Sequence, residues 1–220
     1  MMTPTDLLAD VALFAELTPT ELDQLAQTSE LQELRRGDVL FRENDTADCL
    51  YVVVEGRIAI AKRSIDGRES VVALMESGDL FGEMSLFERL GRSAEARVLE
   101  ASRVLVIAFE PIREVYENRP ELLWGVVALL AGRVRSMDVA LADNVFLDVT
   151  GRTAKRLIEI AGSADEFNLP VTQEELAAMV GASRERVNKA IASFVRLGWI
   201  AQADRRYRIT DREQLERRAR

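Results

Sequence analysis

The first half of the chain has the hydrophobic pattern of a β-sheet protein. Between residues 20 and 110, short β-branched or aromatic runs recur and no proline occurs, as suits paired strands, in which proline is poorly tolerated. Asp66-Gly67 is a type I′ hairpin signal, and Thr18-Pro19-Thr20-Glu21 is a helix-capping box with proline at the first helical position. We therefore predict a short helix followed by a β-barrel or sandwich. The expected strands are Val39–Phe41, Leu50–Val54, Ile58–Ala61 and Val71–Leu74.

After Pro111 the hydrophobic period changes to that of a helix. Pro120 opens a helical segment that extends to about Leu147, and its apolar positions advance by alternate steps of four and three, with Asn144 next in the series. These positions, which we call the seam, are Leu123, Val127, Leu130, Val134, Met137 and Leu141. A seam of this length favours a parallel coiled coil with a second copy, in which Asn144 can set the register. The alternative is a helix that packs on its own barrel.

The C-terminal third has the pattern of a helix-turn-helix. Thr150-Gly151 is predicted to break the long helix, helical sequence resumes over residues 152–161, and residues 162–168 form a polar link. Thr172-Gln173-Glu174-Glu175 is a second capping box, and Gly181 permits a tight turn before a helix that Ser183 can cap. Gly198 lies where a helix-ending glycine is expected.

The exposed face of the second helix is basic at its N-terminal end, where the helix dipole favours acids. This face carries Arg184, Glu185, Arg186, Asn188 and Lys189, and such side chains can contact base edges in a major groove. Asp204-Arg205-Arg206 lies between two short apolar runs and predicts a hairpin with a basic tip. That hairpin is either a wing that touches phosphate or an ordinary surface turn.

Composition narrows the classes of function. The chain has 220 residues, 48% hydrophobic and 30% charged, with no histidine and one cysteine, Cys49. These counts exclude a four-ligand zinc site, an iron–sulfur cluster, a histidine-ligated haem and a Ser-His-Asp triad within one chain. The longest apolar run has 11 residues, and the N-terminus does not resemble a signal peptide. We expect a cytoplasmic protein without membrane contact.

The net charge of -8 is distributed unevenly. Residues 1–149 contain 15 basic and 27 acidic side chains, whereas residues 150–220 contain 14 and 10. A basic module joined to an acidic one is consistent with nucleic-acid binding by the C-terminal part. On charge alone, a chance distribution of surface charge is an equally good explanation.

A possible anion site lies in the barrel. Gly82 permits close backbone approach, a short helical turn can follow it, and Arg92 and Ser93 offer a guanidinium fork and a hydroxyl to a phosphate. Glu83 can accept a hydrogen bond from a sugar hydroxyl. By spacing alone, a loop with a salt bridge is the better interpretation.

The whole chain resembles the cyclic-AMP receptor protein family of bacterial transcription regulators, the CRP/FNR superfamily. Four landmarks occur in the family's order over residues 10–210. They are FGEMSLFERLGRSAEARV at 81–98, FLDVTGR at 146–152, TQEELAAMVGASRERVNKAI at 172–191 and the basic hairpin.

The resemblance implies an α+β fold with three parts: a jelly-roll β-barrel of the cyclic-nucleotide-binding type at 1–118, a dimerisation helix at 119–148 and a winged helix-turn-helix at 149–220. It implies that Gly82 and Glu83 hold the ribose and that Arg92 and Ser93 bind the cyclic phosphate. The full candidate nucleotide site is Gly82, Glu83, Met84, Ser85, Arg92, Ser93, Arg133, Met137 and Asp138.

It further implies that Arg184, Glu185 and Lys189 read bases of a palindromic operator with TGTGA-like half-sites. The two recognition helices of a dimer would then lie about 34 Å apart, one DNA turn. The candidate DNA-binding residues are Thr172, Gln173, Ser183, Arg184, Glu185, Arg186, Asn188, Lys189 and Arg206. The expected partners are DNA, a second copy through residues 120–147, and RNA polymerase, with cAMP as effector and no metal, haem or iron–sulfur cluster.

The sequence departs from the family at the base side of the pocket. Met137 stands where the family usually has a threonine that bonds adenine, and Asp138 follows it. Arg133 can pair with Asp138 or reach the ligand. Met137 and Asp138 therefore leave open a regulator of the same fold that is independent of nucleotide or senses another effector. Two other classes also stay open. They are a metal-dependent enzyme, because small β-barrels house such catalysts, and a nucleotide-binding module without DNA binding.

Overall fold

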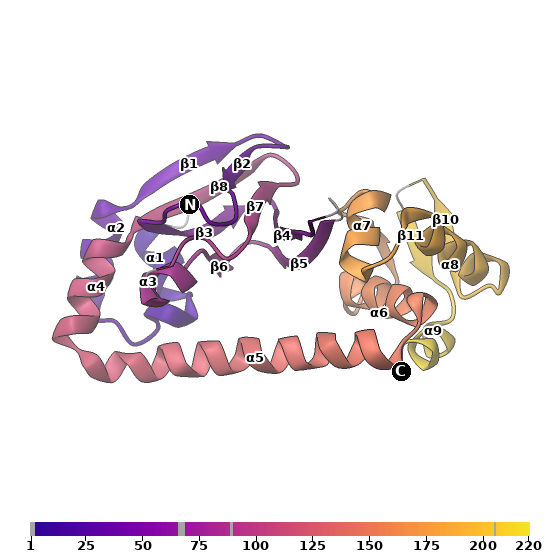
Figure 1. Cartoon of the computed structure of the whole chain (residues 1–220). Coiled ribbons are helices and arrows are strands. Elements are labelled where there is room, and N and C mark those ends of the chain that lie inside the picture. The colour runs from indigo at the N-terminus through magenta and orange to yellow at the C-terminus, as the bar shows by residue number, and fades with distance from the viewer. Residues whose placement is uncertain (1–2, 66–68, 89, 205) are drawn as a thin grey trace. The chain divides into compact units, whose positions relative to one another are not determined.

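The computed structural model describes residues 3–65, 69–88, 90–204 and 206–220. The chain forms two compact units, residues 1–68 with 72–134, and residues 69–71 with 135–220 (Figure 1). The predicted hairpin turn Asp66-Gly67 lies outside the described residues, as does Arg205 of the basic hairpin.

The N-terminal unit contains two four-stranded sheets, with strand orders β1-β8-β3-β6 and β2-β7-β4-β5. All four predicted strands are present, extended by a few residues at most. The pattern did not predict β1, β6, β7 or β8. The strands are β1 Glu30–Leu34, β2 Val39–Phe41, β3 Cys49–Glu55, β4 Ile58–Arg63, β5 Glu69–Met75, β6 Leu80–Phe81, β7 Glu95–Val98 and β8 Ser102–Ala108.

Short helices flank these sheets. They are α1 Pro4–Ala9, η1 Ala12–Phe14, α2 Pro19–Thr28, α3 Met84–Glu88, α4 Phe109–Asn118 and η2 Pro120–Leu122. The predicted capping box at the start of α2 is present, because the Thr18 side chain accepts from the Glu21 amide while the Glu21 carboxylate accepts from the Thr18 amide. The predicted helical turn after Gly82 is also present, as α3.

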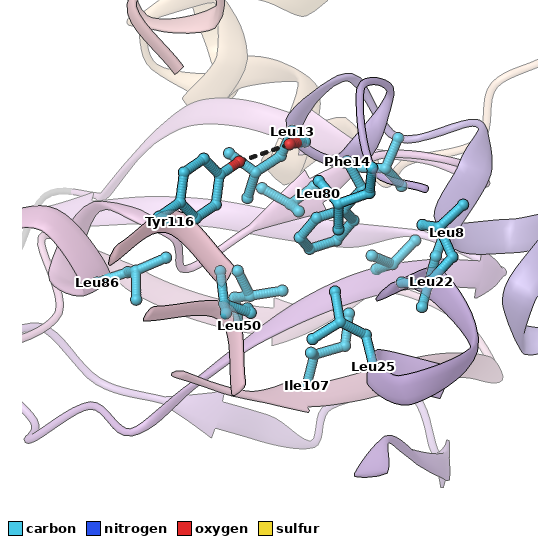
Figure 2. Close-up of a cluster of buried hydrophobic side chains, with 14 of the residues drawn as sticks. Leu8, Leu13, Phe14, Leu22, Leu25, Leu50, Leu80, Leu86, Ile107 and Tyr116 are labelled. Atoms are coloured by element: carbon cyan, nitrogen blue, oxygen red, sulfur yellow. Dashed lines mark hydrogen bonds between the residues drawn. The ribbon is translucent and has the colours of Figure 1, made fainter. Parts of the chain in front are cut away.

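A hydrophobic cluster joins these helices to one sheet. Leu8, Phe14 and Leu25 from the N-terminal helices pack with Leu50 and Ile107 from β3 and β8 (Figure 2). The Tyr116 hydroxyl of α4 donates to the Leu13 carbonyl at 2.6 Å, which satisfies the one polar group of that ring (Figure 2). A second cluster contains residues of both sheets, and in it Phe41 of β2 meets Tyr51 of β3 and Phe81 of β6 as aromatic neighbours.

The predicted long helix is α5 Leu123–Phe146. Its seam residues are 36–69% exposed, whereas Val126 of the same helix is buried in the hydrophobic cluster of the N-terminal unit. Trp124, next to Leu123, is 76% exposed. Over the part of the chain that the structure describes, no helix has both the length and the apolar character that a membrane span requires.

The C-terminal unit is a helix-turn-helix with a small sheet of strand order β10-β11-β9. Gly181 at the turn has φ 68° and Gly198 has φ 75°, both in the left-handed region predicted for them. Trp199 stacks on Phe194 with ring centroids 5.7 Å apart. The elements are α6 Val149–Ala161, β9 Glu166–Asn168, α7 Gln173–Val180, α8 Arg184–Arg196, β10 Ile200–Ala203, β11 Arg206–Ile209 and α9 Arg212–Arg218.

Two local predictions in this unit were wrong. Thr150-Gly151 does not break the helical pattern but lies in the first turn of α6, because Asp148 is the N-cap and its carboxylate accepts from the Gly151 amide at 2.8 Å. The polar link at 162–168 contains strand β9, which pairs with β11. Its hydrogen bonds come from residues some 40 positions later, so the link's own composition does not reveal it.

Candidate functional site

A buried arginine lies at the centre of the predicted anion site. Arg92 is 3% exposed and its guanidinium donates to the Gly82 carbonyl at 2.8 Å. Gly82 has φ 82°, and a Cβ there would lie 2.6 Å from the Arg92 guanidinium. Glycine at 82 is therefore required both by the backbone conformation and by the close approach of Arg92.

The direct contacts of the Arg92 guanidinium are with neutral groups, although the Glu83 carboxylate lies near enough for Arg92 to offset part of the rise that burial causes in its pKa. Its guanidinium carbon lies 4.2 Å from the centroid of the Phe41 ring and 5.5 Å from that of Tyr51, and its second terminal nitrogen donates to the Cys49 sulfur at 3.6 Å. Among the described residues no carboxylate forms an ion pair with Arg92, and its Nε is buried without a hydrogen-bond partner. A buried cation is costly unless a counter-charge is supplied, so this site is suited to an anion.

The adjacent acid is also buried. Glu83 is fully buried, and one of its carboxylate oxygens accepts from the Arg133 guanidinium of α5, which also donates to the Leu80 carbonyl at 3.0 Å. The other oxygen, Oε2, has no partner among the described residues. Burial raises the pKa of Glu83, and the attraction of Arg133 offsets only part of that effect. Arg133 pairs with Glu83, and among the described residues it forms no ion pair with Asp138.

The remaining predicted nucleotide-site residues fall into two groups. Ser85 is buried and donates to the Gly91 carbonyl at 3.3 Å, while exposed Ser93 donates to the Met84 sulfur at 3.5 Å. These residues lie close to Arg92 along the chain. Met137 and Asp138 lie further along α5, where both are exposed.

The recognition surface is the exposed face of α8. Arg184, Glu185, Arg186, Asn188 and Lys189 are all exposed, while Val187, Ala190, Ile191 and Phe194 are buried. The Lys189 ammonium lies 2.7 Å from the Glu185 carboxylate one turn earlier and lowers the pKa of that acid. The surface therefore presents side chains that can contact base edges.

A hollow of about 450 Å³ adjoins this face, lined in part by Thr172, Gln173, Arg184, Asp204 and Tyr207. The Thr172 hydroxyl caps α7 by accepting from the Glu175 amide at 3.2 Å, and the Gln173 amide donates to the Tyr207 hydroxyl at 2.9 Å. Thr172 and Gln173 thus shape the base of the hollow.

The other two candidates, Ser183 and Arg206, are not among the residues that line the hollow. Ser183 caps α8, accepting from the Arg186 amide at 3.4 Å, and Arg206 is exposed at the start of β11.

Sequence reasoning missed Cys49, Phe41 and Tyr51 as neighbours of Arg92. They lie 41 to 51 positions before it and no short motif joins them. The only available signal was the position of Phe41 and Tyr51 in predicted strands, with Cys49 directly before the second of these strands. Residues that can hold a metal are also not grouped: no cluster of three or more Cys, Asp or Glu side chains suited to a metal ion occurs within the described ranges.

Comparison with known proteins identifies both parts. Residues 31–119 match the cyclic nucleotide-binding domain family, and residues 151–218 match the Crp-like helix-turn-helix domain family. Over 98% of its length, the chain is 36% identical to the CRP-like cAMP-activated global transcriptional regulator of Mycobacterium tuberculosis, covering 99% of that protein. The chain belongs to the CRP family of transcription regulators.

Two further similarities agree with this assignment. The cAMP-activated global transcriptional regulator Vfr of Pseudomonas aeruginosa is 30% identical over 81% of this chain and 88% of its own length. The structure of TTHB099, a CRP-family transcriptional regulator of Thermus thermophilus, superposes with a TM-score of 0.71 at 26% identity, covering 86% of this chain and 96% of that one.

Membership of the CRP family confirms the predicted family, fold and class of function. The chain is a transcription regulator with a cyclic nucleotide-binding domain and a DNA-binding helix-turn-helix. The CRP family consists of regulators and not of enzymes, so the metal-dependent enzyme considered from the sequence is ruled out.

Proposed function

We propose that this protein is a homodimeric, sequence-specific transcription regulator that cAMP controls by binding in the barrel. The observation that carries the effector part is the buried guanidinium of Arg92, which has no carboxylate partner among the described residues. A phosphodiester supplies one negative charge and acceptor oxygens, which satisfy a guanidinium fork better than a neutral ligand does.

A nucleotide also fits the neighbouring acid. The unpartnered Oε2 of Glu83 is an acceptor that a ribose hydroxyl can satisfy, while Arg133 holds the other carboxylate oxygen. Cyclic AMP carries a hydroxyl and a phosphate on one sugar. Gly82, Met84, Ser85 and Ser93 complete this half of the proposed site, and the names of the M. tuberculosis and P. aeruginosa relatives support cAMP as the nucleotide.

We propose that Met137 and Asp138 on α5 contact the base of the nucleotide. A methionine can pack on a purine face but does not discriminate by hydrogen bonding, whereas the Asp138 carboxylate can accept from an exocyclic amine. These two residues also motivate the second candidate function, a CRP-family regulator that is independent of cAMP or senses a different effector.

The exposed seam on α5 supports dimerisation through residues 120–147. Its six apolar side chains advance by fours and threes and are open to a partner helix. A parallel pair would present two α8 helices to a palindromic operator with TGTGA-like half-sites. The three-part division at 1–118, 119–148 and 149–220 and a contact with RNA polymerase belong to the same proposal, as does action in the cytoplasm.

For cAMP to control DNA binding, it must bind the conformation that binds DNA more tightly than the conformation that does not. The test is a titration of operator DNA with the purified protein, with and without cAMP, together with calorimetry of cAMP and cGMP binding. Tighter operator binding with cAMP is expected. Operator binding that ignores both nucleotides, with no heat from either, would establish the second candidate.

A further inference from the structure

The hydrogen bonds and ring contacts of the Arg92 guanidinium are all with neutral groups. It donates to a backbone carbonyl and to the Cys49 sulfur, and it lies over the Phe41 ring. Sulfur is a weak acceptor compared with a carboxylate. The guanidinium is therefore oriented in its pocket while its positive charge remains available.

The place of Cys49 in the sheet puts its sulfur beside the Arg92 guanidinium. It begins β3, where it pairs with Ala108 of β8, and it is half-buried. Its thiol donates to the Tyr51 hydroxyl at 3.4 Å while its sulfur accepts from Arg92, so Arg92, Cys49 and Tyr51 form one chain of weak polar contacts. Two residues later on the same strand, the Tyr51 ring faces the same guanidinium.

The Cys49 thiol carries no charge beside the Arg92 guanidinium. The groups around it are Tyr51, Arg92 and Asp48, and burial raises the pKa of Cys49 more than Arg92 lowers it. The thiol is thus neutral at physiological pH. Because the sulfur is neutral, the thiol itself adds no negative charge beside Arg92 that would compete with an anionic ligand.

We propose that Cys49 is a positioning residue for the effector phosphate: it fixes the orientation of Arg92 without neutralising its charge. This inference rests on the proposed function, because it takes the phosphate of a cyclic nucleotide as the anion that Arg92 binds. It goes beyond that function by assigning a determinant of effector affinity to a residue on a different strand from the anion motif.

If Cys49 positions Arg92, a substitution at position 49 can change phosphate affinity without changing stability. If Cys49 only packs, the two properties change together. An acid in place of the thiol forms an internal ion pair with Arg92, so the protein keeps its stability but loses its affinity for phosphate. A serine retains a small neutral acceptor, whereas a valine fills a similar space without accepting a hydrogen bond.

The experiment uses the full chain and measures cAMP affinity by calorimetry and thermal stability in parallel. The variants are Cys49→Ser, Cys49→Val and Cys49→Asp, with Ser70→Asp as the control that adds a charge at an exposed site of β5. On the scale of hydrogen bonds to charged groups, we expect Cys49→Ser to stay within about threefold of the original affinity, Cys49→Val to bind about tenfold more weakly and Cys49→Asp about 100-fold more weakly. The melting temperature of Cys49→Asp should not fall below that of Ser70→Asp.

Two results would overturn the proposal: cAMP affinity of Cys49→Val equal to that of the original protein, or of Cys49→Asp within about threefold of it. If Cys49→Asp does not fold, the comparison of the serine and valine variants decides. Failure of the unmodified protein to bind cAMP would overturn the proposed function itself and this inference with it, whereas cAMP binding that is indifferent to position 49 overturns only the present inference.

Discussion

The guanidinium of Arg133 on α5 holds one oxygen of the buried Glu83 carboxylate and, at the same time, the carbonyl of Leu80. One side chain therefore connects the long helix to the loop that carries the proposed ribose contact. The pair is unequal in burial, since the Glu83 side chain is 1% exposed and that of Arg133 38%.

Replacement of Arg133 should leave a buried acid without its partner. We expect Arg133→Met to lower the free energy of unfolding by about 2–3 kcal/mol, as for a buried charge that loses its counter-ion near solvent. Urea unfolding measures the change. In the double variant with Glu83→Gln the loss should be smaller than the sum of the two single losses, and strict additivity would show that the two residues do not interact.

The pKa of Glu83 makes stability depend on pH in a predictable direction. Burial raises the folded-state pKa of Glu83 above its unfolded value of 4.5. In the pH window between these two values the folded state binds more protons than the unfolded state, so the contribution of Glu83 to stability falls as pH rises. Glu83→Gln removes this contribution. The stability of the variant relative to the original protein should therefore rise with pH above about 4.5 in urea unfolding across the window, and a difference that does not change with pH would contradict the assignment.

The N-cap of α6 should contribute measurably to the C-terminal unit. Asp148 accepts from the Gly151 amide at 2.8 Å and pairs with the Arg218 guanidinium of α9. Asp148→Ala should cost about 1 kcal/mol of stability, as is typical for the loss of such a cap. Asp148→Asn, which retains the cap but not the charge, should cost less. Equal losses for the two variants would assign the effect to the ion pair with Arg218.

The seam predicts the association state. Leu141→Lys places a charge on a 63% exposed seam position, whereas Val139→Lys makes a matched change at a 53% exposed position off the seam. Since each copy would lose a buried leucine, the dimer of Leu141→Lys should be at least about 100-fold weaker. Sedimentation equilibrium should then detect the 24.6 kDa monomer for this variant. Equal masses for the two variants at every concentration would exclude the seam as the interface.

Two arginines of the DNA-binding unit should contribute differently to DNA affinity: Arg184 to sequence-specific binding and Arg206 to binding of any sequence. Arg184→Ala should cost about 1–3 kcal/mol on the operator and relax the preference at one guanine. Arg206→Ala should weaken operator and random duplex alike and reduce the salt slope by about one. Fluorescence anisotropy on both duplexes across a salt series distinguishes these patterns. An equal loss on the two duplexes for Arg184→Ala would remove its base-reading role.

Local signals in the sequence were sufficient for several elements. The capping boxes at Thr18 and Thr172, the glycines at 181 and 198 and the heptad steps of α5 each depend on residues a few positions apart, and the structure has them all. The part of the site around Gly82 and α3 was predictable for the same reason.

Elements that depend on distant partners were not predictable. Strand β1 is polar and mostly exposed, and it is a strand because it pairs with β8 some 70 residues later. Strand β9 exists through β11 in the same way. The contact between Cys49 and Arg92 spans 43 positions and depends on the barrel's closure. Asp148 was overlooked as a cap because the glycine three positions after it suggested a break in the helix.

The positions of the two tryptophans give the molecule a pair of built-in optical reporters. Trp199 is stacked on Phe194 within the helix-turn-helix unit, while Trp124 is 76% exposed beside the first residue of the seam. Emission from Trp124 should therefore lie at longer wavelength than emission from Trp199, and it should shift to the blue when α5 acquires a partner. Emission from Trp199 should not change on dimerisation. Self-association and changes near the recognition helix can thus be followed separately in the unlabelled protein by replacing one indole at a time.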